Sequence, residues 1–399
     1  MLKILYIADL DISKGGGQRR AYEVIRRIAK FNDVYVVSYG VPSIPNGLFE
    51  DASLYATLPR FDRLSIADMV SFLSTFNSYL KTIRNSIKDL RPDIVVITGE
   101  WMYPVNLALY IHKNWNLKTH IAFIVHEVPA IYTISWNQSI SEKIIERIKY
   151  GEPLTLFAAP LLFQVSVKTL KKYNVLHVGF GAKYYMERVG ITNGIVIHPP
   201  NGIDEDYIRK ASAHINKEHI PTLVFMAARL TREKGIYDFI KVFETLRHRI
   251  KTIKAYIMGR LEKSYHDLLN KIKKIPQLKY LGFVDEKTKY RILARSWLMI
   301  YPSKQEAFSI SVLEALACGT PVIAYNIPGI ALNYKQCDAV ITIEPRAKES
   351  MAEKVYHLVI DNARLENLWR KATECSMKYR WEQVVKAEYN AYLKILGCQ

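Results

Sequence analysis

Short apolar runs alternate with longer amphipathic segments along most of the chain. In the first half, the runs predict β-strands at residues 3–8, 33–39, 93–98, 119–125 and 194–197. Between them, residues 18–31 and 65–90 carry apolar side chains every three to four positions, which is typical of amphipathic helices. This alternation favours βαβ units built around a parallel sheet.

The same pattern begins again after a polar stretch at residues 204–220. Further strands are predicted at residues 222–228, 253–258, 278–281, 298–301 and 321–324, with a helix at 236–249. We therefore predict an α/β chain with two Rossmann-like domains, at 1–203 and 222–380, joined by a linker at 204–221. Residues 381–399 form a last amphipathic helix, expected to cross back to the N-terminal domain.

Charge and cysteine content narrow the environment of the protein. Lys and Arg number 56 against 38 Asp and Glu, so the net charge of +18 favours nucleotides, nucleic acid or an anionic membrane surface as partners. Four cysteines without a CxxC pair indicate neither a disulfide framework nor a zinc site, and a reducing interior is the simpler interpretation.

The N-terminal apolar run is too short for a signal peptide. Residues 153–167, interrupted by Pro160 and Gln164, are too short to span a bilayer, which favours buried core over membrane contact.

Arg229 and Lys234 follow the first strand of the second domain, in the segment AARLTREKG at 227–235. In parallel α/β sheets ligands bind outside the carboxyl ends of the strands, so Arg229 and Lys234 should reach a ligand there. Arginine can hold two phosphate oxygens at once, and lysine adds a mobile positive charge.

A second segment, EAFSISVLEALACGTPVIA at 306–324, combines two carboxylates with a helix start. Ser309 is expected to cap a helix that ends at Gly319, and the amino end of that helix suits a phosphate or sugar hydroxyl. Glu306 and Glu314 are eight residues apart, which corresponds to roughly 12 Å if the segment is helical throughout. That separation is comparable with the distance between the sugar and the ribose of one nucleotide sugar.

Together with YLGFVDEKTKYRILARSWLMIYPS at 280–303, these segments resemble the retaining glycosyltransferases of family 4. The resemblance covers most of the C-terminal half and implies the GT-B fold, in which two Rossmann-like domains face each other across a cleft. It also implies a nucleoside-diphosphate sugar as donor and a hydroxyl group of a glycan, lipid-linked or small-molecule acceptor.

The resemblance assigns roles to individual residues. Arg229 and Lys234 would bind the donor diphosphate, Glu306 the sugar hydroxyls and Glu314 the ribose. Further donor contacts are implied at these positions: the base pocket near Phe283 and Val284, the helix start at Phe308, Ser309 and Ile310, the glycine turn at Gly16 and Gly17, and His126 near the sugar. Glu100 and Trp101 would either line an acceptor pocket or pack in the core.

The chain departs from the family pattern in two places. Residues 325–334, YNIPGIALNY, lack the Pro-Glu that many members carry after a Gly-rich turn, and Ser309 replaces a common glycine. Both positions lie near the donor, so the identity of the sugar stays open.

The resemblance thus implies a retaining, hexosyl-transferring enzyme that uses a UDP- or GDP-sugar, and no metal is predicted. The pairs Asp9/Asp11 and Asp204/Asp206 imitate a metal-binding Asp-x-Asp, but capping of a turn or helix explains them better. Rival interpretations are a glycosidase with two carboxylates, a sugar-nucleotide epimerase, and a basic nucleic-acid-binding protein, of which the last lacks an RNA-binding signature. The expected location is the cytoplasm, with peripheral contact at the inner face of an anionic membrane.

Overall fold

The computed structural model describes residues 1–12, 15–44, 48–59, 66–98, 103–111, 119–126, 155–213, 215–261 and 266–398. The chain divides into two compact units. Unit 1 comprises Met1–Pro200 together with Val384–Gln399, and unit 2 comprises Asn201–Gln383. The C-terminal segment of the chain therefore belongs to the same unit as its N-terminus.

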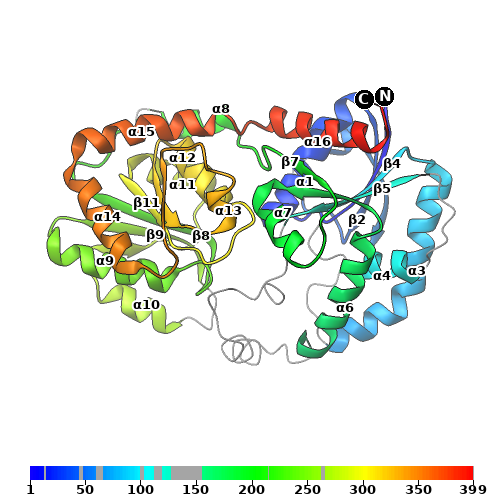
Figure 1. Cartoon of the computed structure of the whole chain (residues 1–399), viewed down its shortest axis with the longest axis horizontal. Coiled ribbons are helices and arrows are strands. Elements are labelled where there is room, and N and C mark those ends of the chain that lie inside the picture. Colours follow the sequence, from blue (N-terminus) through cyan, green and yellow to red (C-terminus); the bar gives the residue numbers. More distant parts are fainter. Residues whose placement is uncertain are drawn as a thin grey trace. The chain divides into compact units, whose positions relative to one another are not determined.

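Unit 1 is built on a seven-stranded parallel sheet with the order β3-β2-β1-β4-β5-β6-β7. Its strands are β1 Lys3–Ala8, β2 Asp33–Tyr39, β3 Ala52–Leu58, β4 Ile94–Thr98, β5 His120–Val125, β6 Asn174–Val178 and β7 Ile195–Ile197. The helices are α1 Gly16–Ile28, η1 Ala29–Phe31, α2 Leu48–Asp51, α3 Ile66–Leu90, α4 Tyr103–Ile111, α6 Thr155–Leu170 and α7 Gly179–Arg188 (Figure 1). All five residues of β4 are buried, as expected for a central strand covered on both faces.

Unit 2 contains a six-stranded parallel sheet with the order β10-β9-β8-β11-β12-β13. Its strands are β8 Thr222–Leu230, β9 Lys254–Leu261, β10 Leu278–Tyr280, β11 Leu298–Tyr301, β12 Val322–Tyr325 and β13 Val340–Ile343. Its helices are α8 Glu205–Ser212, α9 Ile236–Arg249, α10 His266–Lys273, α11 Glu286–Arg295, α12 Ile310–Ala317, α13 Pro328–Ala331, α14 Lys348–Ile360 and α15 Asn362–Ser376.

Helices pack on unit 2 in two groups, as Figure 1 shows: α9 packs against α14, and α12 packs against α11 and α15. The ring of Phe239 on α9 stacks on Phe225 of β8 with 5.1 Å between the ring centroids. Because β8 and β11 are neighbours at the centre of the sheet, the loops that follow them emerge side by side at its carboxyl edge.

The last helix, α16 Trp381–Ile395, is anchored in unit 1 by buried polar groups from Val384 onward. Glu388 forms an ion pair with Arg20 of α1 at 2.5 Å, and both side chains are 1% exposed. Tyr392 hydrogen bonds to Tyr6 of β1 with 3.0 Å between their hydroxyl oxygens. The Nε of Arg20 also donates to the carbonyl of Pro200 at 2.6 Å.

The stretch predicted as a linker at 204–221 contains α8, which is part of unit 2. Asp204 caps this helix by accepting a hydrogen bond from the amide of Tyr207 at 3.0 Å, as the capping interpretation predicted. Ile208 is buried in the core of unit 2. Part of the polar composition of the stretch therefore comes from the exposed side of a helix.

The prediction that the cysteines form no disulfide was wrong. Cys337, before β13, is bonded to Cys375 near the end of α15, with 5.6 Å between their Cα atoms. The two residues are 38 positions apart, and only the packing of α15 beside this turn brings them together. Cysteine spacing alone carries no information about such a contact.

No helix among the described residues is long and apolar enough to cross a membrane.

Candidate functional site

The loop after β8 is fixed against the loop after β11 by a close backbone approach. Gly235 has φ of 83°, and a Cβ atom added there would lie 2.0 Å from the carbonyl oxygen of Pro302. Only glycine tolerates both that conformation and that distance. The approach brings Lys234, at the start of α9, over the residues that follow Tyr301.

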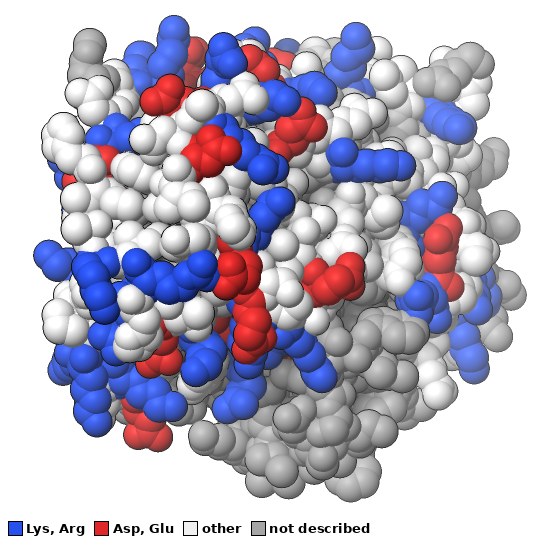
Figure 2. Space-filling model, turned by 60° about the vertical axis from the view of Figure 1, so that its left-hand side comes forward, with Lys and Arg blue, Asp and Glu red and all other residues white. Residues whose placement is uncertain are grey.

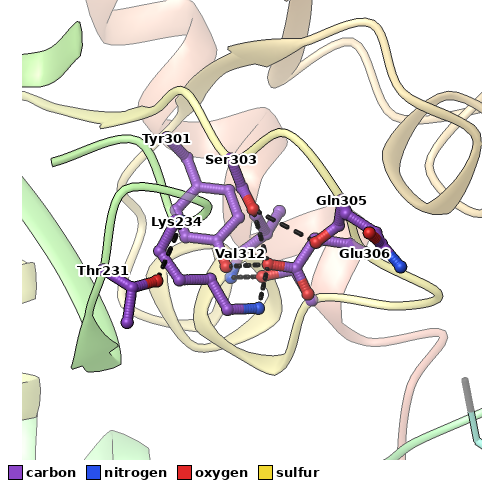
Figure 3. Close-up of polar contacts among 8 residues, drawn as sticks. Thr231, Lys234, Tyr301, Ser303, Gln305, Glu306 and Val312 are labelled. Carbon is purple, nitrogen blue, oxygen red and sulfur yellow. Dashed lines mark hydrogen bonds and ion pairs between the residues drawn. The ribbon is translucent and has the colours of Figure 1, made fainter. Parts of the chain in front are cut away.

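Glu306 is the centre of the polar cluster formed by these loops (Figure 3). Its Oε1 accepts hydrogen bonds from Lys234 Nζ at 2.7 Å, Tyr301 Oη at 2.5 Å and Ser303 Oγ at 2.9 Å. The residue is 5% exposed, so this carboxylate depends on its donors for stabilisation. Burial and the Glu306 charge raise the pKa of Tyr301, which keeps its hydroxyl a donor.

The two oxygens of Glu306 differ in their hydrogen bonding. Within the described residues, no donor lies within hydrogen-bonding distance of its Oε2. One oxygen is therefore held by the protein, and the other can accept hydrogen bonds from hydroxyl groups.

The turn at 325–334 packs against the loop that contains Glu306. A Cβ atom added at Gly329 would lie 1.9 Å from the carbonyl oxygen of Glu306, so the two backbones touch. Asn333 Nδ2 donates to the carbonyl of Ala307 at 2.8 Å, and Tyr334 Oη donates to the carbonyl of Ser309 at 2.8 Å. The turn that departs from the family pattern thus contacts the backbone of Glu306, the candidate sugar-binding residue.

Helix α12 starts as the sequence predicts. Ser309 caps it by accepting a hydrogen bond from the amide of Val312 at 3.3 Å, and Ile310 is its first residue. The ring of Phe308, just before the cap, stacks on Tyr334 with 5.2 Å between the ring centroids. The helix contains Glu314 but not Glu306, so the 12 Å estimate for a continuous helix does not apply.

Glu314 lies on the buried side of α12 and is 8% exposed. Its Oε1 accepts hydrogen bonds from Lys289 Nζ at 2.6 Å and from Tyr290 Oη at 3.3 Å. Both donors come from α11, which packs against α12. The sequence motif assigns no role to Lys289 or Tyr290.

Arg229 occupies the end of β8 and is exposed. It is paired in register with Arg260 of β9, so two arginines stand side by side at the carboxyl edge of the sheet. The Arg260 guanidinium lies 5.5 Å from the ring centre of Phe283, which is 69% exposed, and Val284 is half-buried. Arg260 belongs to none of the sequence motifs, and its pairing with Arg229 is what identifies it as a neighbour of the candidate site.

The candidate residues of unit 1 that the structure describes lie in the segments that follow β1 and β5. Gly16 and Gly17 begin α1, whose first turn holds no acidic residue and whose Gly15 provides no side-chain cap. His126 follows β5, and its Nε2 is 3.1 Å from the Oγ1 of Thr98 at the end of β4. Burial and the nearby Arg20 charge lower the pKa of His126 to about 3, so its imidazole is neutral at physiological pH. Glu100 and Trp101 lie outside the described residues.

The sequence of unit 2 is similar to those of known glycosyltransferases. Residues 208–374 match the family model described as glycosyl transferases group 1. An uncharacterised glycosyltransferase of Methanocaldococcus jannaschii is 28% identical over 173 residues, which cover 43% of this chain and 44% of that protein. The match thus spans less than half the length of that relative.

Solved structures match over the whole chain. Sucrose-phosphate synthase from Thermosynechococcus elongatus superimposes with a TM-score of 0.75 at 14% identity, covering 100% of both chains. The chain has the GT-B fold. HepE from Anabaena in complex with UDP-glucose has a TM-score of 0.68 at 14% identity, again with 100% of both chains covered. The predicted fold, with two Rossmann-like units of the GT-B type, is confirmed.

Proposed function

We propose that this protein is a retaining glycosyltransferase that moves a hexose from a nucleoside-diphosphate sugar to a hydroxyl acceptor. The observation that carries the proposal is the Glu306 carboxylate, held on Oε1 by Lys234, Tyr301 and Ser303. A buried carboxylate with one oxygen committed and one available suits the recognition of sugar hydroxyls. The group 1 family match over this region supports the assignment.

The positive side chains of Lys234, beside Glu306, and of Arg229, at the end of β8, suit a departing diphosphate. Breaking the anomeric bond places negative charge on the leaving group, which Arg229 and Lys234 would stabilise more in the transition state than in the ground state. The amide groups at the start of α12 add a positive dipole near this point. The proposal needs no metal, because these groups supply the charge.

The remaining roles follow from position. Glu314 would hold the ribose, and the exposed ring of Phe283 with the adjacent Val284 would receive the base. Because the HepE complex contains UDP-glucose, UDP-sugars are the first donors to test, with GDP-sugars second. In unit 1, Gly16, Gly17 and the neutral His126 would contact the sugar or acceptor as hydrogen-bonding groups.

The retaining outcome is part of the proposal. The hydroxyls of Tyr301 and Ser303 both donate to the Glu306 carboxylate, and the raised pKa of Tyr301 keeps its hydroxyl protonated. We therefore infer a front-face reaction without a covalent intermediate, in which the leaving phosphate takes the acceptor proton. NMR of the product tests this step: an α-configured donor should give an α-linked product. A β-linked product would contradict retention, and conversion of the donor without any acceptor would indicate an epimerase instead.

We also propose that the enzyme works in the cytoplasm and contacts the inner face of an anionic membrane through basic side chains. Lys and Arg predominate over Asp and Glu on the face in Figure 2. Four exposed lysines, Lys271, Lys273, Lys274 and Lys279, lie within the segment from α10 to β10. Each should add about 1 kcal/mol of attraction. Co-sedimentation with anionic but not neutral vesicles at low salt is expected, and equal binding to both would contradict the contact.

A further inference from the structure

Lys289 lies beside Glu314 in a buried ion pair that the nucleotide-binding motif does not include. Its Nζ is 2.6 Å from Glu314 Oε1, and the two side chains are 16% and 10% exposed. The ammonium group also lies 4.5 Å from the ring centre of Tyr290, whose hydroxyl reaches the same carboxylate oxygen. A second carboxylate, Glu286 on the preceding turn, is farther away at 3.9 Å.

The two oxygens of Glu314 differ in their hydrogen bonding. Oε1 accepts from both Lys289 and Tyr290, whereas Oε2 has no donor within reach among the described residues. A carboxylate held at one oxygen by a charged donor is fixed in orientation, because charge-assisted hydrogen bonds are short and strong. The other oxygen is then held in a fixed position, where it can accept hydrogen bonds from a ligand.

Lys289 also changes the charge that a nucleotide would meet. An unpaired Glu314 at this depth would repel an anionic diphosphate and would be costly to keep ionised. With Lys289 beside it, the pair is neutral overall while Oε2 stays an acceptor. The pair can therefore bind the vicinal hydroxyls of a ribose without opposing the diphosphate.

We propose that Lys289 is a positioning residue that orients Glu314 toward the ribose and thereby makes the site selective for ribonucleotides over nucleotides that lack these hydroxyls. This inference rests on the proposed function, which places the nucleotide sugar in unit 2. A site built around a substrate hydroxyl discriminates strongly against the analogue that lacks it, because its polar group is then left unpaired. Lys289 acts through Glu314 and does not touch the reacting atoms.

Helix α11 supplies a matched control. Lys287 is two residues from Lys289 on the same helix, carries the same charge and is exposed. A change of general electrostatics or helix stability should affect both positions, whereas a change in the orientation of Glu314 should affect Lys289 alone.

The test is titration calorimetry of UDP and GDP and of their 2′,3′-dideoxy forms with the wild type, Lys289→Met, Lys289→Arg and Lys287→Met. The wild type and Lys287→Met should bind the better ribonucleotide at least about tenfold more tightly than its dideoxy form. Lys289→Met should lose about tenfold in ribonucleotide affinity and almost none for the dideoxy form, so that the preference disappears. Lys289→Arg, which keeps the charge and donors, should retain the preference.

Several results would overturn the inference. An unchanged preference in Lys289→Met, or an equal loss for both nucleotide forms, would make Lys289 a merely structural residue. If Lys289→Met does not fold, Lys289→Leu, which also removes the charge and every donor, serves in its place with the same expected loss of preference. Absence of binding of either diphosphate to the wild type would overturn the proposed function itself, so the two failures are distinguishable.

Discussion

At the scale of single residues, the two carboxylates of unit 2 share one design. Glu306 and Glu314 each place one oxygen against a lysine and a tyrosine hydroxyl, and each leaves the other oxygen without a protein donor among the residues described. The motif identified both glutamates and Lys234. It could not identify Tyr301, Lys289 or Tyr290 as partners, because those contacts depend on how the helices and loops pack.

The Lys234–Glu306 pair should be coupled in stability. Lys234→Met removes the charged donor that the described residues provide to a buried carboxylate. It should lower the free energy of unfolding of unit 2 by about 1 to 3 kcal/mol, toward the lower end because Lys234 is 30% exposed. In a double-mutant cycle with Glu306→Gln, measured by urea unfolding, the double variant should lose less than the sum of the single losses. Strictly additive losses would contradict the coupling.

His126 should make unit 1 sensitive to acid. Its pKa is about 3 in the folded protein and about 6.5 when unfolded, so between these values the unfolded chain binds the extra proton. The free energy of unfolding should therefore fall as the pH drops below 6.5, by about 1 to 2 kcal/mol between pH 7 and 5. Unfolding curves of His126→Asn should lack this component. An identical pH dependence in wild type and variant would rule out His126 as its source.

At the scale of elements, most strands and the long helices between them were predictable, including the edge strands β7 and β10, whereas the edge strands β3 and β13 were not. Residues 3–8, 33–39 and 298–301 match β1, β2 and β11 in full, because buried central strands are continuous apolar runs. The unpredicted strands β3 and β13 are at the sheet edges, where half-exposed positions break up the apolar run. The short strand β6, with His177 inside it, was also missed.

The Cys337–Cys375 bond should stabilise the turn behind Glu306. It closes a loop of 38 residues, for which chain entropy gives an upper value of about 4 kcal/mol. Cys337 follows Asn333 and Tyr334, which hold the carbonyls of Ala307 and Ser309. The variant with Cys337 and Cys375 both changed to serine should thus unfold at lower urea concentration and bind the donor more weakly. Cys398→Ser, at an exposed free thiol, is the control and should change neither property.

At the scale of the whole molecule, the C-terminal segment Val384–Gln399 belongs to unit 1, although the residues before it form unit 2. Helix α16 is held there by the Arg20–Glu388 and Tyr6–Tyr392 contacts, which join α1 and β1 to residues more than 360 positions away. The periodicity of the last segment predicts a helix, but its partners could not be predicted, since buried ion pairs across such separations leave no local pattern. The repeated βαβ alternation, by contrast, made the two Rossmann-like units predictable.

The central claim is that unit 2 binds a nucleotide sugar through Lys234, Glu306 and Glu314. The most direct test is titration calorimetry with a panel of UDP- and GDP-sugars on the wild type, Glu306→Gln and Lys287→Met. We predict that at least one nucleotide sugar binds the wild type and Lys287→Met equally, and that Glu306→Gln weakens it about tenfold or more while the matching nucleoside diphosphate binds as before. Absence of binding to the wild type, or unchanged binding of the sugar donor to Glu306→Gln, would contradict the account.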